Sequence, residues 1–215
     1  MTSKALDCTL DIFAFCQGNT VDDTLTDLGR QQARAAARKH LSGQPLYFGV
    51  SCICDCTRDT LCEMANAIGE HTVGAPARVY RTSLLSSHAS SVEEQTKQRP
   101  ASEEVPKSFQ DAPIIPVGTM SETLPLYAKV ASAWTMAALF MIAERAREIG
   151  VTSSGILAVG HSPGIQMAAS HVVRIHPPGV PSGVHYVVQI GDNGKANVIS
   201  SKELEPPTSE EIARV

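Results

Sequence analysis

Two cysteine-containing segments and one histidine stand out as groups that can do chemistry. Cys16 opens the sequence Cys-Gln-Gly-Asn at residues 16–19, and three further cysteines alternate with other residues at positions 52–56. His161 stands in the sequence Gly-His-Ser-Pro-Gly at residues 160–164. A thiolate is a nucleophile and a soft metal ligand, and an imidazole transfers protons or binds metal near neutral pH. Each group follows an apolar run, so the end of a buried strand would hold it.

These apolar runs belong to a pattern in which strands alternate with helices. The sequence predicts strands at residues 10–15, 46–52, 78–80 and 155–159, and a closing hairpin at 185–190 and 196–200. It predicts helices from a cap at Thr24 or Thr26 to about Leu41, over an apolar face formed by Leu61, Met64, Ala65 and Ile68, and at residues 127–148 and 163–173. Such alternation predicts an α/β fold, a three-layer α/β/α sandwich around a mostly parallel sheet.

One polar segment interrupts the pattern. Ser, Glu, Gln, Lys and Pro dominate residues 86–125, and a stretch of this composition cannot form core. We interpret it as a surface insertion or lid on a single domain that spans residues 1–200, because too little chain follows for a second full domain. Residues 201–215 are expected to form a polar, frayed tail.

Composition and charge narrow the class of partner and the location. Apolar residues make up 43% and charged residues 19% of the chain, as in an ordinary globular protein. A net charge of -4 leaves no basic surplus, so nucleic-acid binding is not expected. No signal-peptide-like run opens the chain, and the longest apolar stretch, residues 130–143, is shorter than the roughly 20 residues that cross a bilayer. We therefore expect a cytoplasmic protein, no membrane partner and six reduced thiols.

Four segments in order resemble the histidine-phosphatase, or phosphoglycerate-mutase-like, superfamily. Residues 25–33 (Leu-Thr-Asp-Leu-Gly-Arg-Gln-Gln-Ala) match that family's Leu-Thr-x-x-Gly-x-x-Gln-Ala helix start. Residues 51–65 stand where the family has Ser-Ser-Pro-x-x-Arg-x-x-x-Thr-Ala. Residues 159–164 resemble its strand-end Gly-His motif, in the His-x-Pro-Gly form of the small phosphohistidine phosphatases, and the closing hairpin is the fourth segment. The resemblance covers most of the chain and implies a phosphoglycerate-mutase-like fold.

The resemblance also implies a chemistry that this chain has lost in part. In that family a histidine in an Arg-His-Gly triplet after the first strand attacks phosphorus, and two arginines and a second histidine surround the phosphoryl oxygens. Here Cys16 replaces the first arginine, Gln17 replaces the nucleophile and Gly18 matches the glycine. A glutamine amide cannot carry a labile phosphoryl group. The phosphohistidine mechanism is therefore not expected to operate.

The second arginine of the family is missing from its position as well. With Ser51 aligned on the family's first serine, Cys56 replaces this arginine and Arg58 lies two residues further on. Of the four core groups only His161 remains. Each lost arginine removes charge-assisted hydrogen bonds worth about 1.5–3 kcal/mol. Phosphate binding should therefore weaken on the order of a hundredfold or more.

The cysteines also resemble parts of other phosphatase loops. Residues 16–20 look like the start of the low-molecular-weight tyrosine-phosphatase loop, but Val21 and Asp22 stand where its next Cys and Arg should be. Residues 52–58 have the Cys-x5-Arg spacing of the larger tyrosine-phosphatase loop without its glycines. Cysteines that serve as small buried apolar residues account for these matches better.

Superposition on the family's pocket supports a further hypothesis. It brings Cys16, Cys56 and His161 to the carboxyl ends of neighbouring strands, with Cys54 nearby. These residues are candidate zinc ligands, and Cys16 and Cys56 are alternatively a redox-sensitive pair. The main interpretation assigns no metal and no cofactor.

We therefore expect a phosphoglycerate-mutase-like protein that lacks phosphohistidine-based phosphatase activity and keeps its pocket for binding. The alternative is an enzyme with other chemistry, with His161 as acid or base and Cys16 as nucleophile, or a residual phosphatase. The expected partner is a small-molecule or phosphorylated ligand, and the chain is also a candidate homodimer. The candidate catalytic residues are His161, Cys16 and Gln17, and the candidate pocket residues are Gly18, Cys56, Arg58, Gly160 and Ser162.

Overall fold

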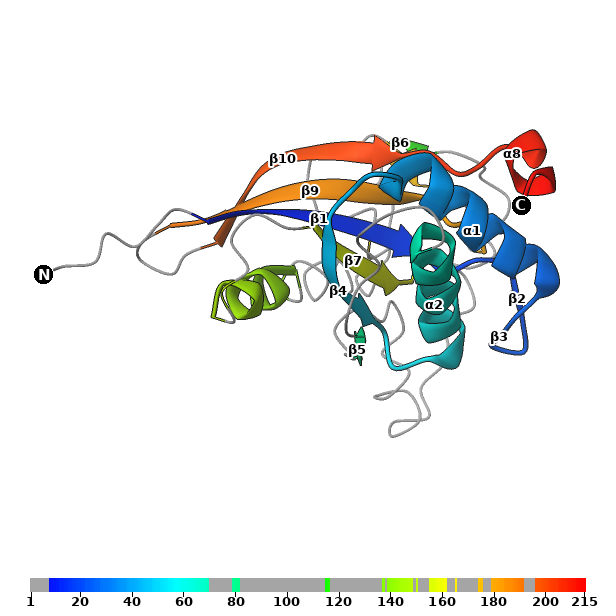
Figure 1. The fold of residues 1–215 in the computed structure, drawn as a ribbon, viewed down its shortest axis with the longest axis horizontal. Helices are drawn as coiled ribbons and strands as arrows, with labels where there is room; N and C mark the ends of the chain where they lie inside the picture. The colour runs from blue at the N-terminus through cyan, green and yellow to red at the C-terminus, as the bar shows by residue number, and fades with distance from the viewer. Residues whose placement is uncertain are drawn as a thin grey trace, which may run out of the picture.

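A six-stranded sheet forms the centre of the computed structural model, in the strand order β10-β9-β1-β7-β4-β5 (Figure 1). The structure describes residues 8–69, 79–81, 115–116, 137, 139–148, 150, 155–161, 165, 174–175, 179–191 and 196–215. The six strands are β1 (Cys8–Cys16), β4 (Leu46–Ser51), β5 (Val79–Arg81), β7 (Gly155–Gly160), β9 (Gly183–Ile190) and β10 (Ala196–Leu204). β7 pairs in parallel with β1 and β4, and β5 pairs in parallel with β4, whereas β9 runs antiparallel to both β1 and β10. The predicted mostly parallel sheet is confirmed.

Side chains of β1 alternate between two apolar cores on opposite faces of the sheet. Leu10 and Ile12 belong to one core together with Leu139, from the helical residues 139–148. Phe13 and Phe15 belong to the other core, which helices α1 (Asp27–Leu41) and α2 (Asp55–Gly69) cover. This two-residue period buries both faces of the strand. The predicted three-layer α/β/α arrangement is confirmed.

Helix α1 begins where the sequence predicts. Thr26 is its N-cap, and the Thr26 hydroxyl accepts a hydrogen bond of 3.0 Å from the backbone N–H of Gly29. The helix lays a face of alanines on the sheet, with Ala33 and Ala36 fully buried. Its small side chains let α1 pack closely, and the chain turns away through Gly43 at φ +78°.

Helix α2 follows β4 and buries three of the four predicted apolar residues. Leu61, Met64 and Ile68 are buried, whereas Ala65 is half-buried. The predicted apolar face therefore wrongly included Ala65. Ala67, which the prediction left out, is buried next to Ile68.

Two short antiparallel strand pairs lie outside the main sheet. β2 (Thr20–Val21) and β3 (Thr24–Leu25) pair antiparallel around Asp22 and Asp23, whose φ angles are 49° and 59°. β6 (Ile115–Pro116) pairs antiparallel with β8 (Arg174–Ile175). Apart from residues 115–116, the polar segment at 86–125 lies outside the described residues, so its interpretation as a lid stays a prediction.

The prediction of a frayed tail after residue 200 is wrong. β10 continues through Leu204, which is 4% exposed and belongs to the apolar core that α1 and α2 cover. After it, helix α8 (Ser209–Ala213) begins with a complete capping box between Thr208 and Glu211. Lys39 of α1 pairs with Glu211 at 3.0 Å and thereby ties α8 to the body of the domain. The expected boundary at residue 200 falls inside a strand.

The outer strand β10 is irregular. Its register with β9 shifts between Val198 and Ser200, which marks a β-bulge.

None of the helices that the structure describes has the length and apolar character needed to cross a membrane.

Candidate functional site

Three chain segments that carry candidate residues leave the sheet side by side. The last residue of β1, Cys16, is the register partner of Gly160, the last residue of β7. Just beyond them, the N–H of Gln17 donates to the carbonyl of Gly160 at 3.1 Å. The N–H of Cys52, directly after β4, donates to the carbonyl of Val159 at 3.0 Å. The carboxyl ends of β1, β4 and β7 therefore bring residues 16–18, 52–54 and 160–161 to one edge of the sheet.

The end of β1 carries a buried thiol and a buried amide oxygen. Cys16 is 0% exposed and belongs to the same apolar core as Ile12, so a substrate has no access to its sulfur. Gln17 is half-buried, and within the described residues its Oε1 has no hydrogen-bond partner. An amide offers neither charge nor a nucleophilic nitrogen at this place.

The chain after Gln17 is anchored by hydrogen bonds from its backbone N–H groups to side chains of α1 and α2. The N–H of Gly18 donates to Thr60 Oγ1 at 3.2 Å, and the N–H of Asn19 donates to Gln32 Oε1 at 3.0 Å. A Cβ on Gly18 would lie 2.6 Å from the carbonyl oxygen of Gly29, so only glycine fits. We call Gly18, Asn19, Thr26, Gly29 and Gln32 the α1 joint. The hydrogen bond between Asn19 and Gln32 was not predicted from the sequence, because the fold brings these two residues together.

The end of β4 and the end of β7 bring two thiols and an imidazole together. The Sγ atoms of Cys52 and Cys54 are 3.7 Å apart, and His161 Nε2 lies 3.4 Å from Cys54 Sγ. The three ligand atoms all lie within 4.8 Å of one another. Cys52 and His161 are buried, at 0% and 5% exposure, and Cys54 is half-buried. We call these three residues the thiol edge.

The thiol edge corrects the set of residues that the sequence had grouped around His161. The expected partners were Cys16 and Cys56 with Cys54 nearby, whereas the structure gathers Cys52 and Cys54. The reason is the register of β4 and β7, which pairs Ser51 with Val159 and so sets Cys52 beside the residues that lead to His161. Cys56 lies in the first turn of α2 and is a free thiol, so no disulfide joins it to Cys16.

The three cysteines at 52–56 affect one another's ionisation. The hydrogen bond with Cys54, together with burial, raises the pKa of Cys52 to about 12. The hydrogen bond from Cys54 lowers the pKa of Cys56 and outweighs the opposing effect of burial. At Cys54 the hydrogen bond from Cys52 favours the thiolate, but the hydrogen bond to Cys56, burial and the nearby charges raise the pKa of Cys54 overall. Cys52 is therefore a protonated thiol at neutral pH.

Arg58 lines the same pocket as Cys54 of the thiol edge, and its guanidinium already forms ion pairs with carboxylates. Its guanidinium bonds to Asp55 at 2.9 Å and to Asp59 at 2.7 Å. Together with Cys54 it lines an open pocket of about 560 Å³ that also contains Asp22 and Asp23. Among the described residues, four carboxylates and one guanidinium line this pocket, which is unfavourable for a phosphate dianion. The candidate residue Ser162 lies outside the described residues.

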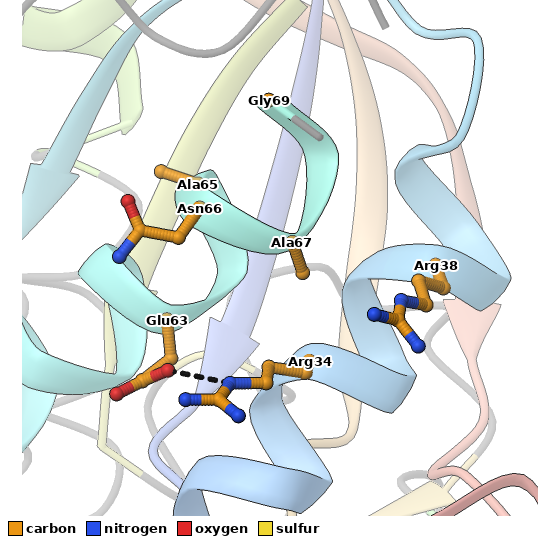
Figure 2. Close-up of a pocket in the computed structure, with 7 residues that line it drawn as sticks. All are labelled: Arg34, Arg38, Glu63, Ala65, Asn66, Ala67 and Gly69. Carbon is orange, nitrogen blue, oxygen red and sulfur yellow. Dashed lines mark hydrogen bonds and ion pairs between the residues drawn. The ribbon is translucent and has the colours of Figure 1, made fainter. Parts of the chain in front are cut away.

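A second pocket, of about 510 Å³, lies between α1 and α2 (Figure 2). Arg34 and Arg38 line one side of it, and Glu63 lies opposite. Glu63 accepts hydrogen bonds from Arg30 at 2.8 Å and from Arg34 at 2.7 Å. Burial opposes the ionisation of Glu63, but the two arginines outweigh it and lower the pKa of this carboxyl. The site was not anticipated from the sequence, and its ion pairs hold α1 against α2.

Comparison with known proteins supports the fold by shape alone. A scan against protein-family models found no match, and a search of curated protein sequences found none either. Among solved structures, a phosphoglycerate mutase from Bacillus anthracis str. Sterne is similar at 14% identity and a TM-score of 0.53, with 97% of each chain covered. A protein described as mycobacterial hydrolase 2 is similar at 13% identity and a TM-score of 0.54, again with 97% of each chain covered.

A third similar structure belongs to the protein histidine phosphatase SixA. It has 10% identity and a TM-score of 0.47, with 90% of this chain and 97% of that chain covered. The likeness to the first two structures shows the fold alone, and membership of the histidine-phosphatase superfamily stays a prediction. The chain has a phosphoglycerate-mutase-like fold.

Proposed function

We propose that this protein is a histidine-phosphatase-fold protein without phosphohistidine-based phosphatase activity, whose strand-end pocket binds a small ligand or a partner. One observation carries the proposal: Gln17, with an amide side chain, stands directly after β1. Its backbone N–H donates to the carbonyl of Gly160, the residue before His161. Phosphoryl transfer through the enzyme needs a nucleophile at that place. An amide nitrogen, whose lone pair is delocalised into the carbonyl, does not supply one.

The charges around the edge support the same conclusion. Catalysis of phosphoryl transfer depends on cationic groups that face the phosphoryl oxygens. Neither Cys16 nor Cys56 can supply a positive charge, and the guanidinium of Arg58 is held by Asp55 and Asp59. The pocket beside Cys54 is lined mainly by carboxylates, so an uncharged or cationic small ligand suits it better than a phosphorylated one.

The alternative of an enzyme with Cys16 as nucleophile receives no support from the geometry. Cys16 is wholly buried, and its sulfur lies within an apolar core. The half-buried Cys54, 3.4 Å from His161, is better placed for thiol chemistry than Cys16. For a phosphorylated substrate, the one cation among the described residues that line the pocket beside Cys54 is Arg58, which two carboxylates already hold.

The experiment compares the native protein with a variant that restores the family's groups. Both are assayed with p-nitrophenyl phosphate and with a phosphohistidine peptide, and the variant carries Cys16→Arg, Gln17→His and Cys56→Arg. We expect turnover in the variant alone. Because Cys16 is 0% exposed, arginine there puts a charge into the core, so a second variant with only Gln17→His and Cys56→Arg is assayed beside it. Comparable turnover in the native protein would contradict the proposal.

A further inference from the structure

We propose that Cys52, Cys54 and His161 bind one divalent ion of the soft or borderline class, of which zinc is the reference, at the edge of the sheet where a histidine phosphatase would hold phosphate. The site goes beyond the proposed loss of phosphatase activity and does not depend on it. It rests on the positions of two sulfurs and one nitrogen, whereas the loss of activity rests on Gln17.

The spacing of the three ligand atoms fits a tetrahedral zinc site. Zinc binds sulfur at about 2.3 Å and imidazole nitrogen at about 2.0–2.1 Å, so tetrahedral angles put two sulfurs about 3.8 Å apart and a sulfur and a nitrogen about 3.5 Å apart. Cys52 Sγ and Cys54 Sγ are 3.7 Å apart, and His161 Nε2 is 3.4 Å from Cys54 Sγ. The third pair, Cys52 Sγ and His161 Nε2, is within 4.8 Å. Two of the three separations already match those of a tetrahedral site, and the third has to be about 3.5 Å once the metal is bound.

Hydrogen bonds hold the two cysteines in this arrangement. The hydroxyl of Thr57 donates to the carbonyl of Cys52 at 3.2 Å and to that of Cys54 at 2.8 Å. The N–H of Cys52 is fixed to Val159 on β7, the strand that leads to His161. The backbone that carries the ligands is therefore largely in place before a metal binds, which lowers the ordering cost of binding.

Charge balance favours a dication at this place. Metal binding replaces the two thiol protons, which are released to solvent, and the two thiolates then neutralise the charge of the ion. A neutral complex can be buried as deeply as Cys52 and His161 are without the penalty of an isolated charge. Imidazole contributes its neutral nitrogen as the third ligand.

The open pocket provides the path of entry. Cys54 is half-buried and lines this pocket together with Asp22 and Asp23. Carboxylates around the mouth raise the local concentration of cations and disfavour anions. Three protein ligands leave a fourth corner of the tetrahedron for water or an added ligand, as in zinc sites that keep an open position.

The test is metal binding by the full chain under reducing conditions. Zinc is titrated into a mixture of the protein and a chromophoric zinc chelator that competes for the metal. We expect one zinc per chain. Cys52→Ser, Cys54→Ser and His161→Ala should each weaken zinc binding on the order of a hundredfold or more, since loss of a ligand costs more than loss of an outer-shell partner. Cys62→Ser is the matched control, because Cys62 is an exposed free thiol on the same helix as Cys56, and it should leave zinc binding unchanged.

A measurement on the native protein covers the case in which a variant fails to fold. X-ray absorption of the zinc-loaded native chain should show two sulfur neighbours at about 2.3 Å and nitrogen or oxygen neighbours at about 2.0 Å. Less than stoichiometric zinc or a zinc shell without two sulfurs would each overturn the proposal. So would a zinc affinity in Cys52→Ser or Cys54→Ser equal to that of the native protein. A Cys52–Cys54 disulfide, found by mass spectrometry in protein purified with reductant, would overturn it too.

Discussion

The α1 joint and the thiol edge lie at the same end of the sheet and are built in opposite ways. In the α1 joint, strong backbone donors meet well-placed oxygen acceptors, and Gly18 and Gly29 approach too closely to admit a side chain. In the thiol edge, the register of β4 and β7 brings weak donors and acceptors close together, and the contacts are made between side chains. The backbone geometry of the joint is set by sterics, whereas the thiol edge can change its chemistry without moving the backbone. A fold can thus persist after the chemistry that usually accompanies it has changed.

The largest effect is expected from adding a side chain to the α1 joint. A Cβ on Gly29 would lie 2.3 Å from the backbone oxygen of Asn19 and 2.9 Å from its nitrogen, and neither atom can move alone. Gly29→Ala should therefore lower the free energy of unfolding by about 3 kcal/mol, despite the better helix propensity of alanine. Urea unfolding measures this change.

Gly43→Ala is the matched control for that substitution. Gly43 has φ +78°, and a Cβ there would meet nothing within 4 Å, so only backbone strain of about 1 kcal/mol is expected. Equal losses of unfolding free energy in the two variants would show that the close approach of Gly29 to Asn19 is unimportant. Sterics would then not set the backbone geometry of the α1 joint.

The next largest effect is expected at the cap of α1. Thr26 accepts from the N–H of Gly29 and donates to Asn19 Oδ1 at 2.8 Å, so Thr26→Ala removes both contacts. We expect a loss of about 1–2 kcal/mol in the free energy of unfolding. Thr208→Ala removes the equivalent cap from the short terminal helix α8 and should cost less than about 0.5 kcal/mol, because that helix can fray locally. A larger loss for Thr208→Ala would reverse the ranking.

A smaller effect, dependent on pH, is expected at the ion pairs between the helices. Glu63→Gln removes the charge that Arg30 and Arg34 share and should cost about 1 kcal/mol at neutral pH. The pKa of Glu63 is lower in the folded chain than in the unfolded chain, so its contribution is present above the unfolded value and is lost as pH falls through the folded one. The difference in stability between the two proteins should therefore shrink as pH falls below the ordinary glutamate pKa of about 4.3 and vanish below the lowered pKa of Glu63. A difference that persists to pH 2 would assign the effect to packing.

The smallest effect, and one of opposite sign, is expected at the site itself. Gln17→Met keeps the length of the side chain and removes an amide oxygen that is buried without a partner among the described residues. Stability should be unchanged or rise by up to about 1 kcal/mol, because an unsatisfied polar atom is no longer buried. Thermal unfolding of the two proteins decides this, and a loss above about 1 kcal/mol would show that the amide is well satisfied.

The parts of the fold that were predicted correctly have local signals. The run at residues 10–15 and the cap at Thr26 are read from neighbouring residues, and both are where they were expected. The structure of the C-terminal residues was missed although Thr208 and Glu211 form a recognisable capping box, since the polar composition around them obscured it. The pair β2 and β3 was missed because Asp22 and Asp23 hold positive φ angles that glycine or asparagine usually takes.

The candidate site was predicted only as far as the strand ends. That Gln17 and His161 come to one edge follows from the parallel order of strands, which motifs can indicate. Which cysteines join His161 depends on the register of β4 against β7, in which residues far apart in the sequence pair with one another. The contact of Gly18 with Thr60 is similarly made between residues 42 positions apart.

The bulge in β10 bears on how copies of the chain can associate. β10 borders the sheet, and an incoming strand could add to such a border through consecutive backbone hydrogen bonds. The shift of register between Val198 and Ser200 breaks that repeat, and beyond it Lys202 and Glu203 place charges on the strand. A second molecule that tried to extend the sheet here would find a template only a few residues long, which guards the folded chain against aggregation by strand addition.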